Sequence, residues 1–183
     1  MAKIAFIGTH GVGKTTLCFD LGAVLKKRGL HVDLVKEVAR LSPLPINRKT
    51  SLEAQLWILT TQIAEEIRSA AHHEVVVCDR SVLDNYAYLM FAAGRQRWLE
   101  PLVNRWMKGY DLLFKVPLVS AAQADGVRDT DEFFMRQIDR LVDELVLERA
   151  LPCTRLPEGG REDWARLASE AVLRLPSLAE RLF

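Results

Sequence analysis

The chain has too few cysteines, spaced too widely, for a disulfide framework or a zinc site. Cys18, Cys78 and Cys153 form no C-x-x-C pair. We therefore expect reduced thiols and a cytoplasmic protein. No apolar run reaches the roughly 18 residues of a membrane span, and the chain enters a predicted strand at once, which leaves no room for a signal peptide. Neither a membrane nor secretion is expected.

An excess of charge of either sign is also missing. The 183 residues include 25 Lys and Arg against 24 Asp and Glu, which gives a formal net charge of +1. A nucleic-acid partner is therefore not expected, because such proteins collect many cations against the phosphates. A balanced net charge does not exclude a local basic groove. The length favours one domain, residues 1–183, with a sizeable core.

What the chain does contain is a specific phosphate-binding pattern, G-x-x-x-x-G-K-[ST], directly after its first apolar run. The pattern consists of Gly8, Thr9, His10, Gly11, Val12, Gly13, Lys14 and Thr15. Backbone N–H groups of such a loop and the start of the following helix hold a polyphosphate. We expect Lys14 to reach the β- and γ-phosphates, Thr15 to bind Mg²⁺ and Thr16 to complete the nucleotide site. The alternative is a glycine turn that binds nothing.

Short β-prone runs alternate with longer helical patterns along the chain. The predicted strands are 3–7, 31–36, 74–78, 111–116 and a weak one at 150–154, and the predicted helices are 16–28, 51–71, 82–93, 97–108 and 131–149. This alternation is typical of an α/β fold whose parallel sheet is covered by helices on both faces.

Charged residues follow two of the predicted strands, at the edge where parallel sheets bind ligands. After the third strand, Asp79 is a candidate Mg²⁺ ligand and Arg80 can clamp phosphoryl oxygens. After the second strand, Glu37 can accept the proton of an acceptor hydroxyl, with Arg40 beside it. The alternatives are that Asp79 only caps the next helix and that Glu37 and Arg40 form a solvated surface pair.

Together, the P-loop, Glu37, the triplet Asp79-Arg80-Ser81 and the later segment 125–129 resemble the P-loop nucleoside and nucleotide kinase superfamily. The AAA_28-type group, which is similar to ribosylnicotinamide, deoxynucleoside and thymidylate kinases, resembles the chain most. The resemblance implies a three-layer fold with a five-stranded parallel sheet in the order 2-3-1-4-5 and a helical lid. The chain departs from deoxynucleoside kinases at two positions. The triplet carries Asp where those kinases usually have Glu, and Glu37 lacks the proline that commonly follows their catalytic base.

Residues 120–140 are the candidate lid. Kinases of this superfamily close such a segment over the triphosphate, where its arginines offset charge on the transferred group and water is excluded. Arg128 is the first candidate for a catalytic arginine, and Arg136 a further nucleotide-binding residue. Arg136 and Arg140 share one helix face, so each could instead pair with acidic neighbours on the surface.

Two further features are weaker. Arg161 follows a glycine pair, where related kinases border the adenine, so it is a candidate for stacking on the base, although a glycine pair is first of all a turn. Tyr86, Tyr88 and Trp57 could stack on an acceptor base, but core packing is the more common role of such residues.

The sequence thus predicts an ATP- and Mg²⁺-dependent kinase that acts on a small molecule, with a nucleoside or nucleotide as acceptor. Lys14, Glu37, Asp79, Arg80 and Arg128 are its predicted catalytic residues. A regulatory or assembly NTPase that hydrolyses ATP without an acceptor is the alternative, and a polynucleotide-end kinase is a third. The choice between ATP and GTP and the oligomeric state, a homodimer included, stay open.

Overall fold

The computed structural model describes residues 1–46, 49–118 and 132–179. These residues form a five-stranded sheet in the order β2-β3-β1-β4-β5, and every strand pairing is parallel. The strands are β1 (Ala2–Ile7), β2 (Val32–Val35), β3 (Val75–Asp79), β4 (Leu112–Lys115) and β5 (Thr154–Arg155). The predicted α/β class and the strand order 2-3-1-4-5 are confirmed.

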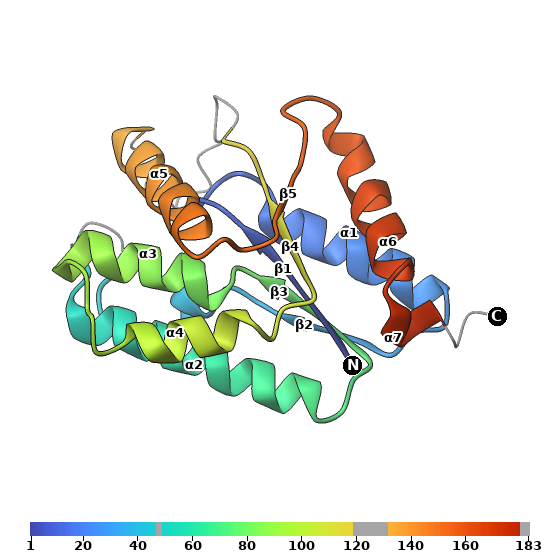
Figure 1. Ribbon diagram of the computed structural model, residues 1–183, viewed down its shortest axis with the longest axis horizontal. Helices are drawn as coiled ribbons and strands as arrows, with labels where there is room; N and C mark the ends of the chain where they lie inside the picture. Colours follow the sequence, from blue (N-terminus) through green and yellow to red (C-terminus); the bar gives the residue numbers. More distant parts are fainter. Residues whose placement is uncertain (47–48, 119–131, 180–183) are drawn as a thin grey trace.

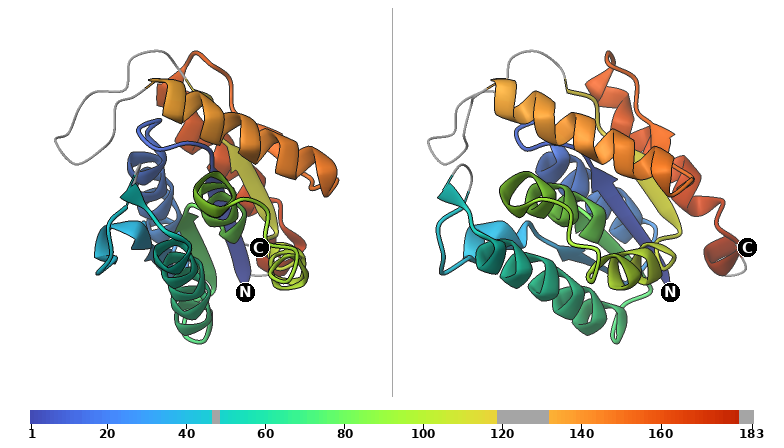
Figure 2. Two further views of the ribbon diagram at one scale, coloured as in Figure 1. Left: turned by 90° about the vertical axis from the view of Figure 1, so that its left-hand side faces the viewer. Right: turned by 60° about the vertical axis from the view of Figure 1, so that its left-hand side comes forward.

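Helices cover both faces of this sheet, as Figures 1 and 2 show. On one face lie α1 (Lys14–Lys27), α6 (Trp164–Leu173) and the short α7 (Pro176–Ala179). On the other face lie α2 (Leu52–Ala70), α3 (Val82–Ala93), α4 (Glu100–Met107) and α5 (Glu132–Glu148). Two short 3-10 turns, η1 (Val38–Leu41) and η3 (Arg161–Asp163), follow β2 and precede α6.

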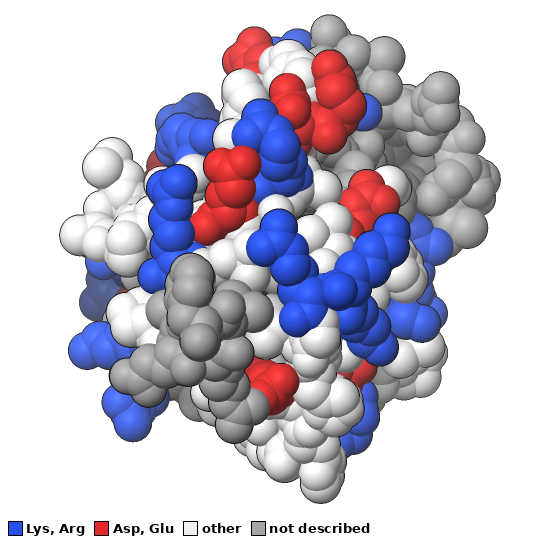
Figure 3. Space-filling model, turned by 90° about the vertical axis from the view of Figure 1, so that its right-hand side faces the viewer, with Lys and Arg blue, Asp and Glu red and all other residues white. Residues whose placement is uncertain are grey.

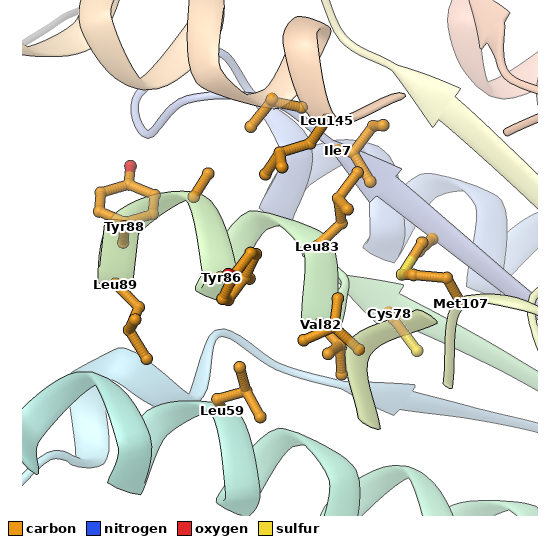
Figure 4. Close-up of a cluster of buried hydrophobic side chains, with 14 of the residues drawn as sticks. Ile7, Leu59, Cys78, Val82, Leu83, Tyr86, Tyr88, Leu89, Met107 and Leu145 are labelled. Atoms are coloured by element: carbon orange, nitrogen blue, oxygen red, sulfur yellow. The ribbon is translucent and has the colours of Figure 1, made fainter. Parts of the chain in front are cut away.

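Alternation along β1 divides the core into two clusters. Ile4 and Phe6 pack with the α1 and α6 side chains, whereas Ala5 and Ile7 pack with those of α3 and α5. Successive strand residues point to opposite faces, so a strand covered on both sides is apolar throughout. Figure 4 shows the second cluster, in which Ile7 lies near the side chains of α3. The sheet is therefore packed on both faces, and its strand ends can position the side chains of a binding site.

The start of α4 differs from its predicted position. The helix begins at Glu100 rather than at residue 97, and Pro101 occupies its first turn. A helix that started at residue 97 would place the proline at its fifth position, where its missing N–H group breaks the backbone ladder. The prediction of this boundary was therefore wrong by three residues.

The fifth strand is shorter than predicted and lies further along the chain. It contains only Thr154 and Arg155, rather than residues 150–154. The helix α5 runs on to Glu148, and Ala150 turns the chain with a left-handed φ of 47°. Pro152 then delays pairing with β4, because it has no N–H group to donate. The pairing joins Phe114 to Thr154.

The carboxyl ends of β1, β3 and β4 meet at one edge of the sheet. Phe6 of β1 is in register with Asp79 of β3, and Ile7 with Lys115 of β4. At this edge the chain leaves β1 for residues 8–13, which lead into α1. Within the described residues, no helix combines the length and apolar character needed to cross a membrane.

Candidate active site

The P-loop takes a backbone path that depends on glycine. Gly8 has a φ of +133°, and a Cβ atom at this position would lie 2.9 Å from the carbonyl oxygen of Val116. Gly13 has a φ of +98° and is the N-cap of α1. The helix begins at Lys14, two residues before the predicted start at 16, because the loop winds directly into the first turn. Its N-terminus therefore faces the loop concavity, as phosphate binding requires.

Lys14 lies inside this loop. Its Nζ donates to the carbonyl oxygens of Gly8, at 2.9 Å, and Thr9, and its side chain is buried. Burial, aided by the nearby positive charge of Arg80, lowers the pKa of Lys14 to about 8. The ammonium group thus stands where a bound polyphosphate would offset the cost of burying it.

Thr15 and Asp79 meet across the edge of the sheet. The Thr15 hydroxyl donates to Oδ2 of Asp79 at 2.5 Å. Burial raises the pKa of Asp79, against the opposite effect of Lys14 and the Thr15 hydroxyl. Asp79 does not cap α3, because Ser81 is the N-cap and its Oγ accepts from the backbone N–H of Leu83 at 3.1 Å. A hydroxyl and a carboxylate in contact form the kind of oxygen donor pair that suits Mg²⁺.

Arg80, which is buried, and Glu37, which is mostly buried, form an ion pair. Nη2 of Arg80 lies 2.5 Å from Oε1 of Glu37, although the two residues are 43 positions apart. Arg40 also donates to Glu37, from Nε to Oε2 at 3.2 Å. Burial alone would raise the pKa of Glu37, but the Arg80 guanidinium lowers it to about 2. Glu37 is therefore ionised at neutral pH. Of the surface pair considered above, Arg40 is exposed, whereas Glu37 is mostly buried and also pairs with Arg80.

A pocket opens beside this ion pair. Its wall contains Glu37 and Arg80, together with His10 of the P-loop, and apolar surface from Ile46 and Ile58. The pocket thus touches the P-loop on one side and the Glu37 carboxylate on the other. Mixed apolar and polar walls of this kind are typical of small-molecule sites.

Tyr88 of α3 also lines the pocket, and its ring lies 4.6 Å from the Arg80 guanidinium. Its side chain is buried, which agrees with core packing, but Figure 4 shows its hydroxyl pointing away from the labelled side chains. That hydroxyl accepts from the backbone N–H of His10 at 3.1 Å and lies 2.9 Å from His10 Nδ1. Tyr88 therefore joins α3 to the P-loop, a role that the sequence analysis did not predict.

Asp84 is a second residue that sequence reasoning missed. Its Oδ1 accepts from the backbone N–H of Gly8 at 2.7 Å, and its Oδ2 accepts from that of Ser81 at 2.8 Å. The spacing of Ser81 and Asp84 is that of a capping box, S-x-x-D, which was the signal available in the sequence. Through this carboxylate the start of α3 holds the start of the P-loop.

The other P-loop residues lie in the loop or in the first turn of α1. Thr9 and Val12 are buried, Gly11 has a φ of +77°, and Thr16 is exposed in the first turn of α1. All of them lie in the loop or at the start of the helix that follows it, so the predicted donor residues are close together in space.

Three of the predicted arginines of the lid and the last loop contact residues other than the predicted site residues. Arg136 and Arg140 are exposed on α5, where they pair with Glu132 and Glu144 at 2.5 and 2.7 Å. Arg161 places its guanidinium 5.4 Å from the ring of Trp164. Arg128 lies outside the described residues, as does most of the predicted lid. The roles of these four arginines therefore stay predictions.

Groups of three or more potential metal ligands among His, Cys, Asp and Glu are absent from the described part of the chain. The Thr15 and Asp79 pair suits Mg²⁺, which is usually held by one or two protein groups together with substrate phosphates. On the face drawn in Figure 3, acidic side chains lie among the basic ones, so this face is not a uniform positive surface.

Comparisons with known proteins identify a matching family model and two similar proteins. The model of the AAA_28 family, described as an AAA domain, matches residues 3–164. A probable thymidylate kinase from Thermoplasma volcanium is 32% identical over 109 residues, which cover 57% of this chain and 55% of that protein. The chain thus spans about half the length of this curated relative. The crystal structure of thymidylate kinase from Ehrlichia chaffeensis superposes with a TM-score of 0.67 at 18% identity, over 94% of this chain and 98% of that one.

Proposed function

Since the chain belongs to the AAA_28 family of P-loop domains, we propose that it is an ATP- and Mg²⁺-dependent phosphotransferase whose acceptor is a nucleoside or nucleotide. The Glu37–Arg80 pair carries this proposal. It joins the wall of a pocket to the strand end that also bears Asp79, so one edge of the sheet serves both a phosphate donor and an acceptor. The similarity to two thymidylate kinases supports the choice of acceptor class.

On the donor side, the loop amides and Lys14 bind the phosphates. Thr15 and Asp79 would hold Mg²⁺, which would supply positive charge to stabilise the phosphates. Arg80 is buried next to Asp79 and fixed by Glu37, so its charge is in place before the reaction begins. Such preorganised charge needs no rearrangement as the transition state forms.

On the acceptor side, Glu37 orients the attacking group. The acceptor oxygen forms a bond to the γ-phosphorus while the bond between that phosphorus and the leaving oxygen of ADP breaks. A hydroxyl acceptor gives its proton to Glu37. A carboxylate with a pKa of about 2 is a weak base, so this proton moves late, once the new bond has made the hydroxyl acidic. Glu37 therefore acts mainly as an ionised hydrogen-bond acceptor.

The test is acceptor dependence. Purified protein with Mg-ATP is offered a panel of nucleosides, nucleotides and other hydroxyl metabolites, and ADP release is followed for each. We expect one acceptor class to raise the rate well above the rate without acceptor. Equal ADP release whatever is added would contradict the proposal and favour an NTPase that hydrolyses ATP.

A further inference from the structure

The turn that bears Arg80 lies near a buried carboxylate. This carboxylate has no role in the proposed reaction. Glu66 of α2 is only 1% exposed. Its Oε1 accepts from Nε2 of Gln62 at 2.9 Å and from the hydroxyl of Tyr110 at 2.5 Å. Its Oε2 accepts from Nζ of Lys3 at 2.8 Å and from Nε1 of Trp106 at 2.7 Å. Four donors, one of them the buried ammonium group of Lys3, thus fix this carboxylate.

Two of these donors connect Glu66 to the backbone on either side of Ser81. Nε2 of Gln62 donates a second time, to the carbonyl oxygen of Arg80 at 3.3 Å. The Tyr110 hydroxyl accepts from the backbone N–H of Val82 at 3.1 Å. One carboxylate therefore restrains both ends of the turn through two intermediary side chains.

This turn needs such restraint. Arg80 has a φ of +89°, a left-handed conformation that residues other than glycine rarely adopt. Such a strained conformation persists only where the surroundings impose it. On the sheet side, the Arg80 N–H donates to the carbonyl oxygen of Phe6 at 3.2 Å. On the opposite side, the bond from Gln62 holds the Arg80 carbonyl group.

The orientation of Gln62 follows from its partners. The Glu66 carboxylate and the Arg80 carbonyl oxygen both accept hydrogen bonds, so the amide nitrogen must face them. Gln62 is fully buried, and its Oε1 has no hydrogen-bond partner in the described part of the chain. An unpaired buried oxygen lowers stability, so core packing alone would favour an apolar residue here. Donation to the turn is what the glutamine adds.

We propose that Gln62, held by Glu66, is a positioning residue that keeps the Arg80 turn left-handed and so keeps the guanidinium against Glu37. This inference rests on the proposed phosphotransferase function, because Arg80 is the group through which Gln62 acts. Without the bond from Gln62, the turn relaxes towards ordinary φ values and the Arg80 side chain moves out of line with the pocket.

The first test does not depend on catalysis. In Gln62→Met the side chain keeps its approximate length but cannot donate, while the Lys3–Glu66 ion pair stays intact. NMR signals of the Arg80 guanidinium, identified by their loss in Arg80→Lys, are compared in the protein without acceptor. We expect them to shift or broaden in Gln62→Met and to stay in place in Val172→Ala, a destabilising control on α6, on the other face of the sheet. Unchanged signals in Gln62→Met overturn the inference.

The second test is kinetic. Gln62→Met should lower kcat by up to about 100-fold, as misplaced catalytic groups do, with the KM for ATP changed by less than about threefold. In a Glu37→Gln background the same substitution should have little further effect, because both changes act on one ion pair. The positioning role is contradicted if Gln62→Met lowers kcat by the same factor in the wild-type and Glu37→Gln backgrounds. It is also contradicted if kcat is unchanged although the NMR signal shifts. A wild-type protein without acceptor-dependent turnover refutes the proposed function instead, and the NMR comparison still decides whether Gln62 holds the turn.

Discussion

Arg80 at the end of β3 and Arg136 on α5 have the same side chain in different settings. Arg80 is buried, strained in its backbone and paired with Glu37 across 43 residues. Arg136 is 65% exposed and pairs with Glu132 four residues earlier on the same helix. A buried, fixed guanidinium acts on a reacting group at low dielectric, whereas an exposed one is screened by water and can change partners. Burial and long-range pairing, rather than residue type, therefore make Arg80 a stronger candidate than Arg136 for a catalytic arginine.

The largest effect is expected at Lys14, the buried charge inside the P-loop. Lys14→Ala should lower turnover by about 10³-fold or more, because it removes the ammonium group from the loop concavity. Steady-state kinetics with Mg-ATP measures the loss. Lys27→Ala, at the exposed C-terminal end of the same helix, is the control and should retain wild-type rates. Full activity in Lys14→Ala would remove the P-loop from the mechanism.

Arg80→Lys tests whether buried geometry matters beyond charge. Lysine cannot reproduce the planar fork of a guanidinium, so kcat should fall by about 10²- to 10³-fold, while the protein stays folded. The matched variant is Arg140→Lys, which makes the same change at an exposed position. If both variants kept wild-type kcat, the distinction between buried and exposed arginines would have no functional meaning.

The Glu37–Arg80 ion pair should also make the free energy of unfolding depend on pH. Because the pKa of Glu37 is lowered from 4.5 to about 2, its ionisation contributes about 3 kcal/mol of folding free energy. The sign follows from the lowered pKa: the contribution is complete well above pH 4.5 and is lost as the pH falls through that value towards 2. Denaturant unfolding of wild type and Glu37→Gln should thus show a stability difference at pH 7 that shrinks between pH 5 and pH 2. A difference that stays constant over this range would argue against the ion pair.

The smallest effects are expected on α5. Arg136→Ala and Arg140→Ala should each change stability by less than about 0.5 kcal/mol, since both lose exposed pairs within one helix. Arg136 is a predicted nucleotide-binding residue, and we expect a loss in kcat of less than about tenfold for Arg136→Ala, as befits a screened cation. Arg140→Ala is its control. A loss as large as that of Arg80→Lys would show that Arg136 moves into the site when substrates bind.

The sequence predicted the parts of the fold that depend on local pattern. Alternating apolar runs and helical periodicity identified all five strands, and the P-loop spacing located the phosphate loop. Boundaries were less accurate where one residue decides them, as Pro101 does at the start of α4 and Ala150 does before β5.

Contacts between distant residues were harder to predict. Glu37 and Arg80 were singled out because both follow strands, but nothing in the sequence indicated their direct pairing. The bonds from Gly8 to Asp84 and from His10 to Tyr88 span 76 and 78 positions, and they depend on how α3 docks against the sheet. The network around Glu66 was missed for the same reason, since an acidic residue on a helix is ordinarily read as exposed.

The fate of the γ-phosphoryl group tests the central claim most directly. Protein is incubated with γ-labelled ATP, Mg²⁺ and the acceptor that most increases ADP release, and the label is traced in wild type and Glu37→Gln. The account predicts that the wild type transfers label to the acceptor in a one-to-one ratio with ADP, and that Glu37→Gln still binds nucleotide but transfers far less. Label found only as inorganic phosphate, at a rate that does not depend on the acceptor, would contradict it.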